Sequence, residues 1–284
     1  MRSNTTPSLR WLKAMGIISV IGVFAVNAAG FIDHDTHSGQ GCGADWPLCH
    51  GAVVPRFDNT AVVIEYVHRL LTLGFVVALV VFLVGAWRYS RYAQQWKRFM
   101  VILLSLLAIE TVICTLGVLW NVPAAIMAIL APLGLAAQSV LVVMVLALWR
   151  YPVVTSRTAL SSRVEVWMAT ALAVNLYMGA WITYAHPTLL VQELFHLSGM
   201  GVAVGAVWWV WQQRHSAHHL VNSLVGIPLL GVALITHFVT GTVVGDTLIV
   251  AWLSWATSAV AFLTIGRQKP RPNLMRLNIL RQIR

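Results

Sequence analysis

Charge is scarce in this chain. Only 10% of its 284 residues are Asp, Glu, Lys or Arg, whereas a soluble globular domain carries about 25%. Cysteine is also rare, with three residues in all, and the 20 glycines fall far below the share of a collagen-like chain. These shortages exclude a soluble enzyme with one water-facing surface, a disulfide-rich scaffold, a fibrous chain and a disordered one.

Apolar residues take the place of the missing charge. They make up 58% of the chain, and the mean hydropathy is +0.77. Both values are typical of a polytopic helical membrane protein. No cleavable signal peptide is evident, because the apolar stretch after Lys13 lacks a clear small-residue cleavage site. We interpret that stretch as the first transmembrane helix.

Eight stretches are long enough to cross a bilayer, which takes about 20 mostly apolar residues. We therefore predict an all-α membrane protein with eight transmembrane helices. An even number of spans places both termini on one side of the membrane. The predicted spans are 14–32, 61–86, 99–120, 124–148, 164–184, 189–212, 221–241 and 247–266.

Basic residues favour one side of the predicted membrane. All but two of the 19 lysines and arginines fall at the termini or in the even-numbered connections, and the exceptions are Arg56 and Arg69. The positive-inside rule makes this side cytoplasmic, so both termini are predicted to be cytoplasmic. Membrane orientation thus accounts for the net charge of +10, and we predict no nucleic-acid partner.

The acidic residues fall on the opposite side. Asp33, Asp35, Asp45, Asp58 and Asp246 are all predicted to lie in outer loops. The one long outer loop runs from about 33 to 60, and a long ordered loop in a compact protein is usually functional. A tolerated insertion is the alternative.

An internal repeat is visible along the chain. We interpret it as two pseudo-twofold-related four-helix bundles about an axis along the membrane normal. A transporter is an alternative, because transporters also use such repeats. The matching pairs are Glu-x-x-His at 65–68 and 193–196, Val-Asn at 26–27 and 174–175, and a glycine at 117 and 241.

The repeat also predicts the domain organisation. The N-terminal half (1–148) carries the outer loop and the first site. The C-terminal half (164–266) carries the second copy of the motif, and a basic cytoplasmic tail (267–284) follows.

Three histidines lie inside predicted spans: His68, His196 and His237. A polar side chain in the bilayer is a candidate site residue, and an interhelical hydrogen bond is the alternative. Glu-x-x-His places both side chains on one helix face, where the imidazole can bind a metal or heme. A di-iron centre needs more carboxylates, and Glu110 is the only other acid well inside a span, so heme is favoured.

Glu65 lies one helical turn from His68 and could act in proton transfer. The alternative is an ion pair with Arg69 at i+4.

Cys42 and Cys49 lie in the outer loop, on an oxidising side where disulfides persist. Metal binding together with His50 and a reactive thiol pair are the alternatives for these two cysteines.

The loop sequence at 41–51, Gly-Cys-Gly-Ala-Asp-Trp-Pro-Leu-Cys-His-Gly, is followed by Ile-Glu-Tyr-Val-His-Arg at 64–69. This combination resembles the heme A synthase family. The resemblance implies oxidation of the C8 methyl group of heme O to a formyl group, giving heme A, with O2 and external electrons. It further implies a catalytic heme in the first half and a heme b in the second half.

The resemblance also assigns residues. It implies a Cys42–Cys49 disulfide, a catalytic Glu65, His68 as a ligand of the first heme and His196 as a ligand of heme b. His237 is either a second ligand beside His196 or a hydrogen-bond partner of a heme propionate. The implied partners are heme O, O2, a membrane or soluble electron donor, heme O synthase and the lipid bilayer. The implied location is the cell membrane, with the outer loop on the extracytoplasmic side.

The chain departs from the family at two ligand positions. The family pairs the histidine of the second helix with one on the fourth, and that of the sixth with one on the eighth. Neither 124–148 nor 247–266 contains histidine, and Pro132 and Trp252 stand near the expected places. Met127 is either a weak ligand or a packing residue. The alternative function is a non-catalytic or electron-transferring heme b protein of the same fold.

Overall fold

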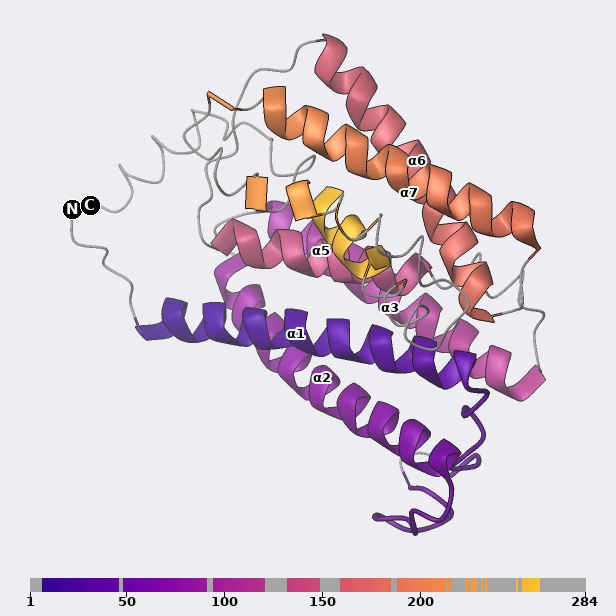
Figure 1. The fold of residues 1–284 in the computed structure, drawn as a ribbon. Coiled ribbons are helices and arrows are strands. Elements are labelled where there is room, and N and C mark those ends of the chain that lie inside the picture. The colour runs from indigo at the N-terminus through magenta and orange to yellow at the C-terminus, as the bar shows by residue number, and fades with distance from the viewer. Residues whose placement is uncertain are drawn as a thin grey trace, which may run out of the picture.

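Helices provide all the regular secondary structure in the part of the chain that the computed structural model describes. That part comprises residues 7–45, 48–90, 94–120, 132–148, 159–184, 188–212, 214–215, 223–224, 226–228, 231, 233, 249 and 252–260. Figure 1 labels six helices, and residues 252–260 form a further helical run. The six are α1 (Pro7–Asp35), α2 (Thr60–Ser90), α3 (Gln94–Trp120), α5 (Pro132–Leu148), α6 (Ala159–Tyr184) and α7 (Leu189–Gln212).

Five described helices are long and apolar enough to cross a membrane. They cover Arg10–Asp35, Thr60–Arg88, Lys97–Leu116, Val166–Thr183 and Leu189–Gln212. Their outer faces are apolar, which suits lipid and not water. The chain is therefore a multi-pass membrane protein. On α2 the exposed apolar side chains recur every three or four residues: Val63, Val67, Leu70, Leu73, Val77, Val80, Val84 and Trp87.

The predicted spans coincide with helices wherever the structure describes them. Helices α1 and α6 begin earlier than predicted, at Pro7 and Ala159, because a helix can continue into water beyond its apolar segment. Residues 124–131 and most of the last two predicted spans lie outside the described residues. The count of eight spans therefore stays a prediction.

Two capped helix ends direct the chain into and out of the outer loop. At the end of α1, the N–H groups of His37 and Ser38 donate to the carbonyls of His34 and Asp33, at 3.1 and 2.8 Å. His37 has a φ of 53°, so this end is a Schellman motif. At the start of α2, the Asn59 side chain accepts from the Ala61 N–H at 3.0 Å, as an N-cap does.

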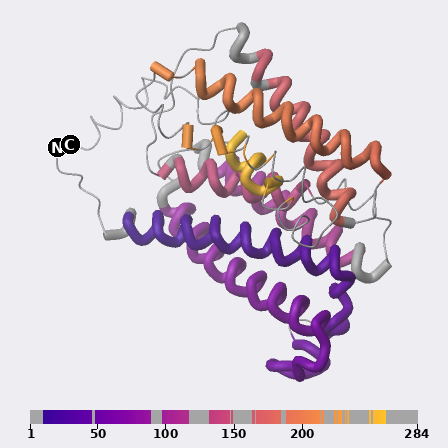
Figure 2. The backbone as a smooth tube through the Cα atoms, in the orientation of Figure 1, coloured from indigo at the N-terminus to yellow at the C-terminus, as the bar shows by residue number. Residues whose placement is uncertain are grey.

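The helices pack mainly as neighbouring pairs. Helix α1 lies against α2, α6 against α7, and α3 against α5, and α1 also contacts α5. Figure 2 shows α6 and α7 running side by side, apart from the α1–α2 pair.

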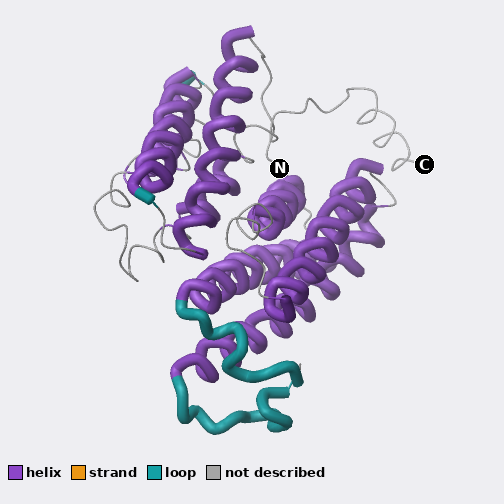
Figure 3. Tube along the Cα trace, turned by 90° about the vertical axis from the view of Figure 1, so that its right-hand side faces the viewer, coloured by secondary structure: helices purple, strands orange, loops and turns teal. Residues whose placement is uncertain are grey.

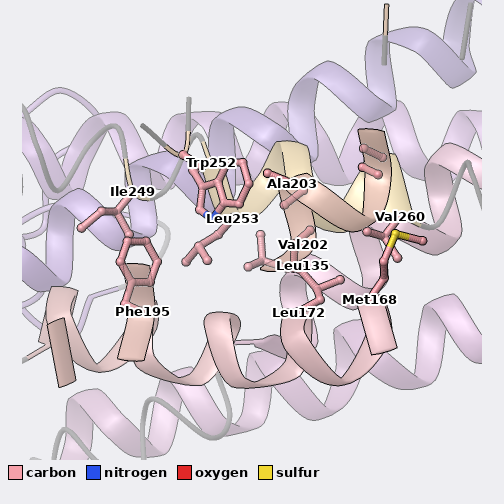
Figure 4. Close-up of a cluster of buried hydrophobic side chains, with 14 of the residues drawn as sticks. Leu135, Met168, Leu172, Phe195, Val202, Ala203, Ile249, Trp252, Leu253 and Val260 are labelled. Carbon is pink, nitrogen blue, oxygen red and sulfur yellow. The ribbon is translucent and has the colours of Figure 1, made fainter. Parts of the chain in front are cut away.

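Buried apolar side chains gather in two main clusters. The first draws on α1, α2, α3 and α5. The second draws on α6, α7 and residues 249 and 252–260, with Phe31 and Leu135 contributed by the preceding helices (Figure 4).

A buried amide links the two clusters. The Gln138 side chain on α5 accepts from the Asn27 amide at 3.0 Å. It donates to the Ser254 carbonyl at 3.1 Å and to the Ser258 hydroxyl at 2.9 Å. Interhelical hydrogen bonds of this kind hold membrane helices together where burial in lipid gives little driving force.

Candidate functional site

The outer loop between α1 and α2 is closed by a disulfide. Figure 3 shows the described part of this loop in teal, beyond the ends of the two helices. Cys42 and Cys49 are bonded to each other, and both are fully buried. The predicted disulfide is thus confirmed. Among the described residues, no group of three or more His, Cys, Asp or Glu side chains could hold a metal ion.

Glu65 contacts the loop directly. Its Oε2 accepts from the backbone N–H of Cys42 at 2.5 Å, and its Oε1 accepts from Nε of Arg69 at 3.0 Å. A second Arg69 nitrogen also donates to Oε1. The carboxylate is 6% exposed. The i+4 ion pair is therefore present, and Glu65 also holds the loop; neither fact tests a catalytic role.

Arg69 extends this contact to both sides of the disulfide. Its Nη1 donates to the carbonyl of Leu48 and its Nη2 to the carbonyl of Gly43, each at 2.5 Å. Leu48 precedes Cys49, and Gly43 follows Cys42. Charge-assisted hydrogen bonds from one guanidinium thus fix both arms of the loop to α2.

Tyr66 holds a more distant part of the loop. Its hydroxyl donates to the Val53 carbonyl at 3.0 Å, and its ring lies 5.8 Å from the ring of Phe57. Glu65, Tyr66 and Arg69 therefore all fasten the loop to the outer end of α2.

The loop also packs closely against α2 at Gly41, where a side chain has no room. A Cβ atom at Gly41 would lie 2.8 Å from the backbone nitrogen of Val62 and closer still to the carbonyl of Ala61. Both atoms belong to the first turn of α2, so neither can rotate away. We expect Gly41→Ala to lower the free energy of unfolding by about 1–3 kcal/mol, because overpacking forces the backbone to shift. Thermal unfolding in detergent measures it.

Ala44→Ser is the matched control for Gly41→Ala, since Ala44 is an exposed loop residue. It should change the unfolding free energy by no more than about 0.5 kcal/mol. Equal melting temperatures for Gly41→Ala and Ala44→Ser would contradict the proposed close approach.

The disulfide gives a labelling prediction. The chain has three cysteines, and Cys114 is the free one. Denatured but unreduced protein should therefore gain one alkyl group by mass spectrometry, and reduced protein should gain three. Three alkyl groups without reductant would show that the loop cysteines are thiols in the isolated protein.

His68 lies on α2, one helical turn after Glu65. Its Nδ1 lies 3.4 Å from Oδ2 of Asp33, whose carboxylate is 6% exposed. The other oxygen, Oδ1, is buried and has no hydrogen-bond partner among the described residues. A Cβ at Gly30 would lie 3.4 Å from Nε2 and Cε1, so the glycine leaves room beside that edge of the ring.

The described helices bury few side chains around His68. On α2, no residue between Glu65 and Phe75 is buried, and on α3 none of residues 104–116 is. The apolar clusters lie on either side, around the disulfide and around Phe75. A metal-ligating histidine usually has its second nitrogen toward a carboxylate, as His68 has its Nδ1 toward Asp33. These residues fit the expected heme.

Several known proteins are similar to this chain in sequence. The chain is 26% identical over 289 residues to the heme A synthase of Halalkalibacterium halodurans, covering 90% of this chain and 95% of that protein. The chain is thus similar to a heme A synthase over most of its length. The enzyme of Staphylococcus carnosus is 28% identical over 185 residues, with 63% of this chain and 60% of the relative covered.

A third heme A synthase, from Staphylococcus saprophyticus, is 27% identical over 223 residues, covering 72% of this chain and 73% of the relative. No protein-family model matches the chain.

The second copy of the repeated motif has a different environment from the first. Glu193 is exposed, whereas Glu65 is buried. His196 is half-buried, and its ring meets that of Phe195 edge-on, with the centroids 5.3 Å apart. His237 lies outside the described residues. The role of His196 as a heme ligand stays a prediction.

The remaining candidates lie away from the loop. Glu110 on α3 is half-buried, and its carboxylate lies against Gly134 of α5, in the space that a Cβ would fill. That position favours a contact between helices. Met127 lies outside the described residues.

Sequence reasoning missed two features of this candidate site. Asp33 was predicted in an outer loop, but it lies in the last turn of α1 and is buried beside His68. The Arg69 contacts to the loop carbonyls were also missed. One signal was available for Asp33. It is an acidic residue within two helical turns of the end of a predicted apolar helix. No local pattern could have shown which loop carbonyls Arg69 reaches.

Proposed function

We propose that this protein oxidises the C8 methyl group of heme O to a formyl group, giving heme A, with O2 and external electrons. Similarity to proteins named heme A synthase supports the reaction. The observation that carries the proposal is the arrangement at the outer end of α2. There the disulfide loop, Glu65 and His68 lie within two helical turns of each other.

His68 is the residue that would hold a heme in the first half. Its Nδ1 faces Asp33, so Nε2 is the nitrogen left for iron. A bound heme would supply the iron that activates O2. The stretch of α2 without buried side chains, between the two apolar clusters, supports placing the macrocycle there.

Glu65 is assigned to proton transfer near the outer mouth of the bundle. It lies one turn from His68, and its carboxylate oxygens already accept hydrogen bonds from Cys42 and Arg69. These bonds hold the carboxylate in one place, one helical turn from His68. The disulfide loop that they fasten would cover this end of the site.

The proposal places the protein in the cell membrane with the outer loop on the extracytoplasmic side. The basic side and the disulfide in the loop both support this orientation. We also retain eight spans in two halves, 1–148 and 164–266, with the basic tail 267–284. The two apolar clusters support the division into halves.

Expression in cells that make heme O but no heme A tests the reaction. Extracted hemes separated by reversed-phase chromatography should include heme A when the chain is present. Heme O without heme A, from protein that contains heme, would favour the electron-transferring or non-catalytic alternative.

Asp33→Asn tests the positioning of His68. A carboxylate that accepts from the second nitrogen of a ligating histidine makes the ligand more basic. We expect Asp33→Asn to raise the heme midpoint potential by on the order of 60 mV, a tenfold change in relative affinity for the two iron states. A spectroscopic redox titration measures it. Asp35→Asn is the neighbouring control, and equal potentials in both variants would remove Asp33 from the site.

A further inference from the structure

The second half of the chain has a closed core at the level of His196. Trp252 is 1% exposed, and Asn175 on α6 is fully buried. The indole N–H of Trp252 donates to Oδ1 of Asn175 at 2.7 Å. Nδ2 of Asn175 donates in turn to the carbonyl of Phe195 at 2.7 Å. One asparagine thus ties α6 to both α7 and the helical run 252–260.

Apolar side chains fill the space around this asparagine. Figure 4 shows Phe195, Ile249, Trp252 and Leu253 gathered at one end of the cluster. Each is at most 1% exposed. Phe195 is the residue next to His196, so this packing lies beside the predicted heme ligand.

Two glycines show how closely the helices approach here. A Cβ at Gly179 of α6 would lie 2.9 Å from the Phe195 ring and 3.0 Å from Leu253. A Cβ at Gly199 of α7 would lie 3.0 Å from Nδ2 of Asn175. Small residues bring membrane helices into close contact in this way. The core at this point leaves no room for a methyl group.

The heme b expected from the family does not fit this half. A heme held from α7 on one side and from the 252–260 run on the other would lie between those helices. Trp252, Phe195 and Leu253 occupy that place, and Trp252 stands near the position expected for the second histidine. On α2, by contrast, no residue between Glu65 and Phe75 is buried, so the two halves differ in the described residues.

We propose that the second half binds no heme and that the Trp252–Asn175 core takes the place of heme b. The protein then holds a single heme, at His68, and the inference rests on the proposed function for that site. The Glu-x-x-His motif at 193–196 is a remnant of the repeat without a ligand role, in keeping with the exposed Glu193. Electrons from the donor must reach the first half without a second heme as a relay.

Heme stoichiometry in the purified full chain tests the inference. Total heme of all types is measured as pyridine hemochrome and divided by protein from amino-acid analysis, after hemin is titrated into the protein to saturation. We expect one heme per chain for the wild type and for His196→Ala, and almost none for His68→Ala. Two hemes per chain, or the loss of heme in His196→Ala, would overturn the inference.

Product formation is scored separately, so that the two proposals can fail independently. One heme per chain without heme A contradicts the proposed reaction and leaves the closed second half standing. A stoichiometry of none contradicts the heme at His68 and again leaves the second half without heme.

Trp252→Phe distinguishes a loss of stability from a loss of heme binding. It keeps a ring in the core and removes the hydrogen bond to Asn175, so we expect a lower melting temperature with unchanged stoichiometry. A fall in bound heme at an unchanged melting temperature would show that Trp252 serves a heme, and would overturn the inference.

Discussion

Replacing His68 by alanine is expected to remove heme from the protein and to abolish heme A formation. Among the described imidazoles, His68 is the one whose Nδ1 lies 3.4 Å from Oδ2 of the buried Asp33. Loss of a partner that merely orients a ligating histidine costs about 10–100-fold in metal affinity, and loss of the ligand itself costs more. Heme content in the variant should therefore fall to less than about a tenth of the wild-type value, as measured by pyridine hemochrome.

His215→Ala is the matched control, because His215 is exposed beyond the end of α7. It should retain heme and product at wild-type levels. Circular dichroism should show equal helicity in both variants. Normal heme content in His68→Ala would place the heme elsewhere and contradict the assignment of the ligand.

Replacing Glu65 by glutamine should impair the reaction and leave the folded protein intact. Glutamine keeps an oxygen that can accept from the Cys42 N–H, so the loop and the heme should be retained. It cannot take up a proton as a carboxylate does. We expect heme A formation to fall by about 10²–10⁴-fold, the range for loss of a general acid or base. Chromatography of extracted heme measures the product.

Arg69→Met is a comparison variant. It removes the same ion pair by replacing the arginine instead of the glutamate. It leaves Glu65 buried without its cation and two loop carbonyls without their donor. Breaking a buried pair in this way costs about 3–5 kcal/mol, so this variant should lose stability as well as activity. Unchanged heme A formation in Glu65→Gln would contradict its catalytic role, and loss of heme in that variant would show a structural one.

The sequence predicts the features that depend on neighbouring residues. Helix positions follow from apolar stretches, and every predicted span with a described counterpart is a helix. The Glu65–Arg69 pair follows from the i+4 spacing. The disulfide could be anticipated because Cys42 and Cys49 share one loop on an oxidising side. The ion pair and the disulfide each join residues fewer than ten positions apart.

Contacts between distant segments could not be predicted in the same way. His68 meets Asp33 across 35 positions, and Trp252 meets Asn175 across 77. Such pairs depend on how helices are rotated and how closely they approach, which apolar periodicity does not specify. The repeat was also a poor guide to environment, because equal spacing at 65–68 and 193–196 gave one buried and one exposed glutamate.

The core around Trp252 has a consequence for biogenesis. It is completed by side chains of the chain itself, so this half needs no cofactor to reach its final packing after membrane insertion. We expect cells starved of heme to accumulate an inserted apoprotein that resists proteolysis in this half, since degradation acts on opened chains. Heme supplied later could then bind this apoprotein without new protein synthesis.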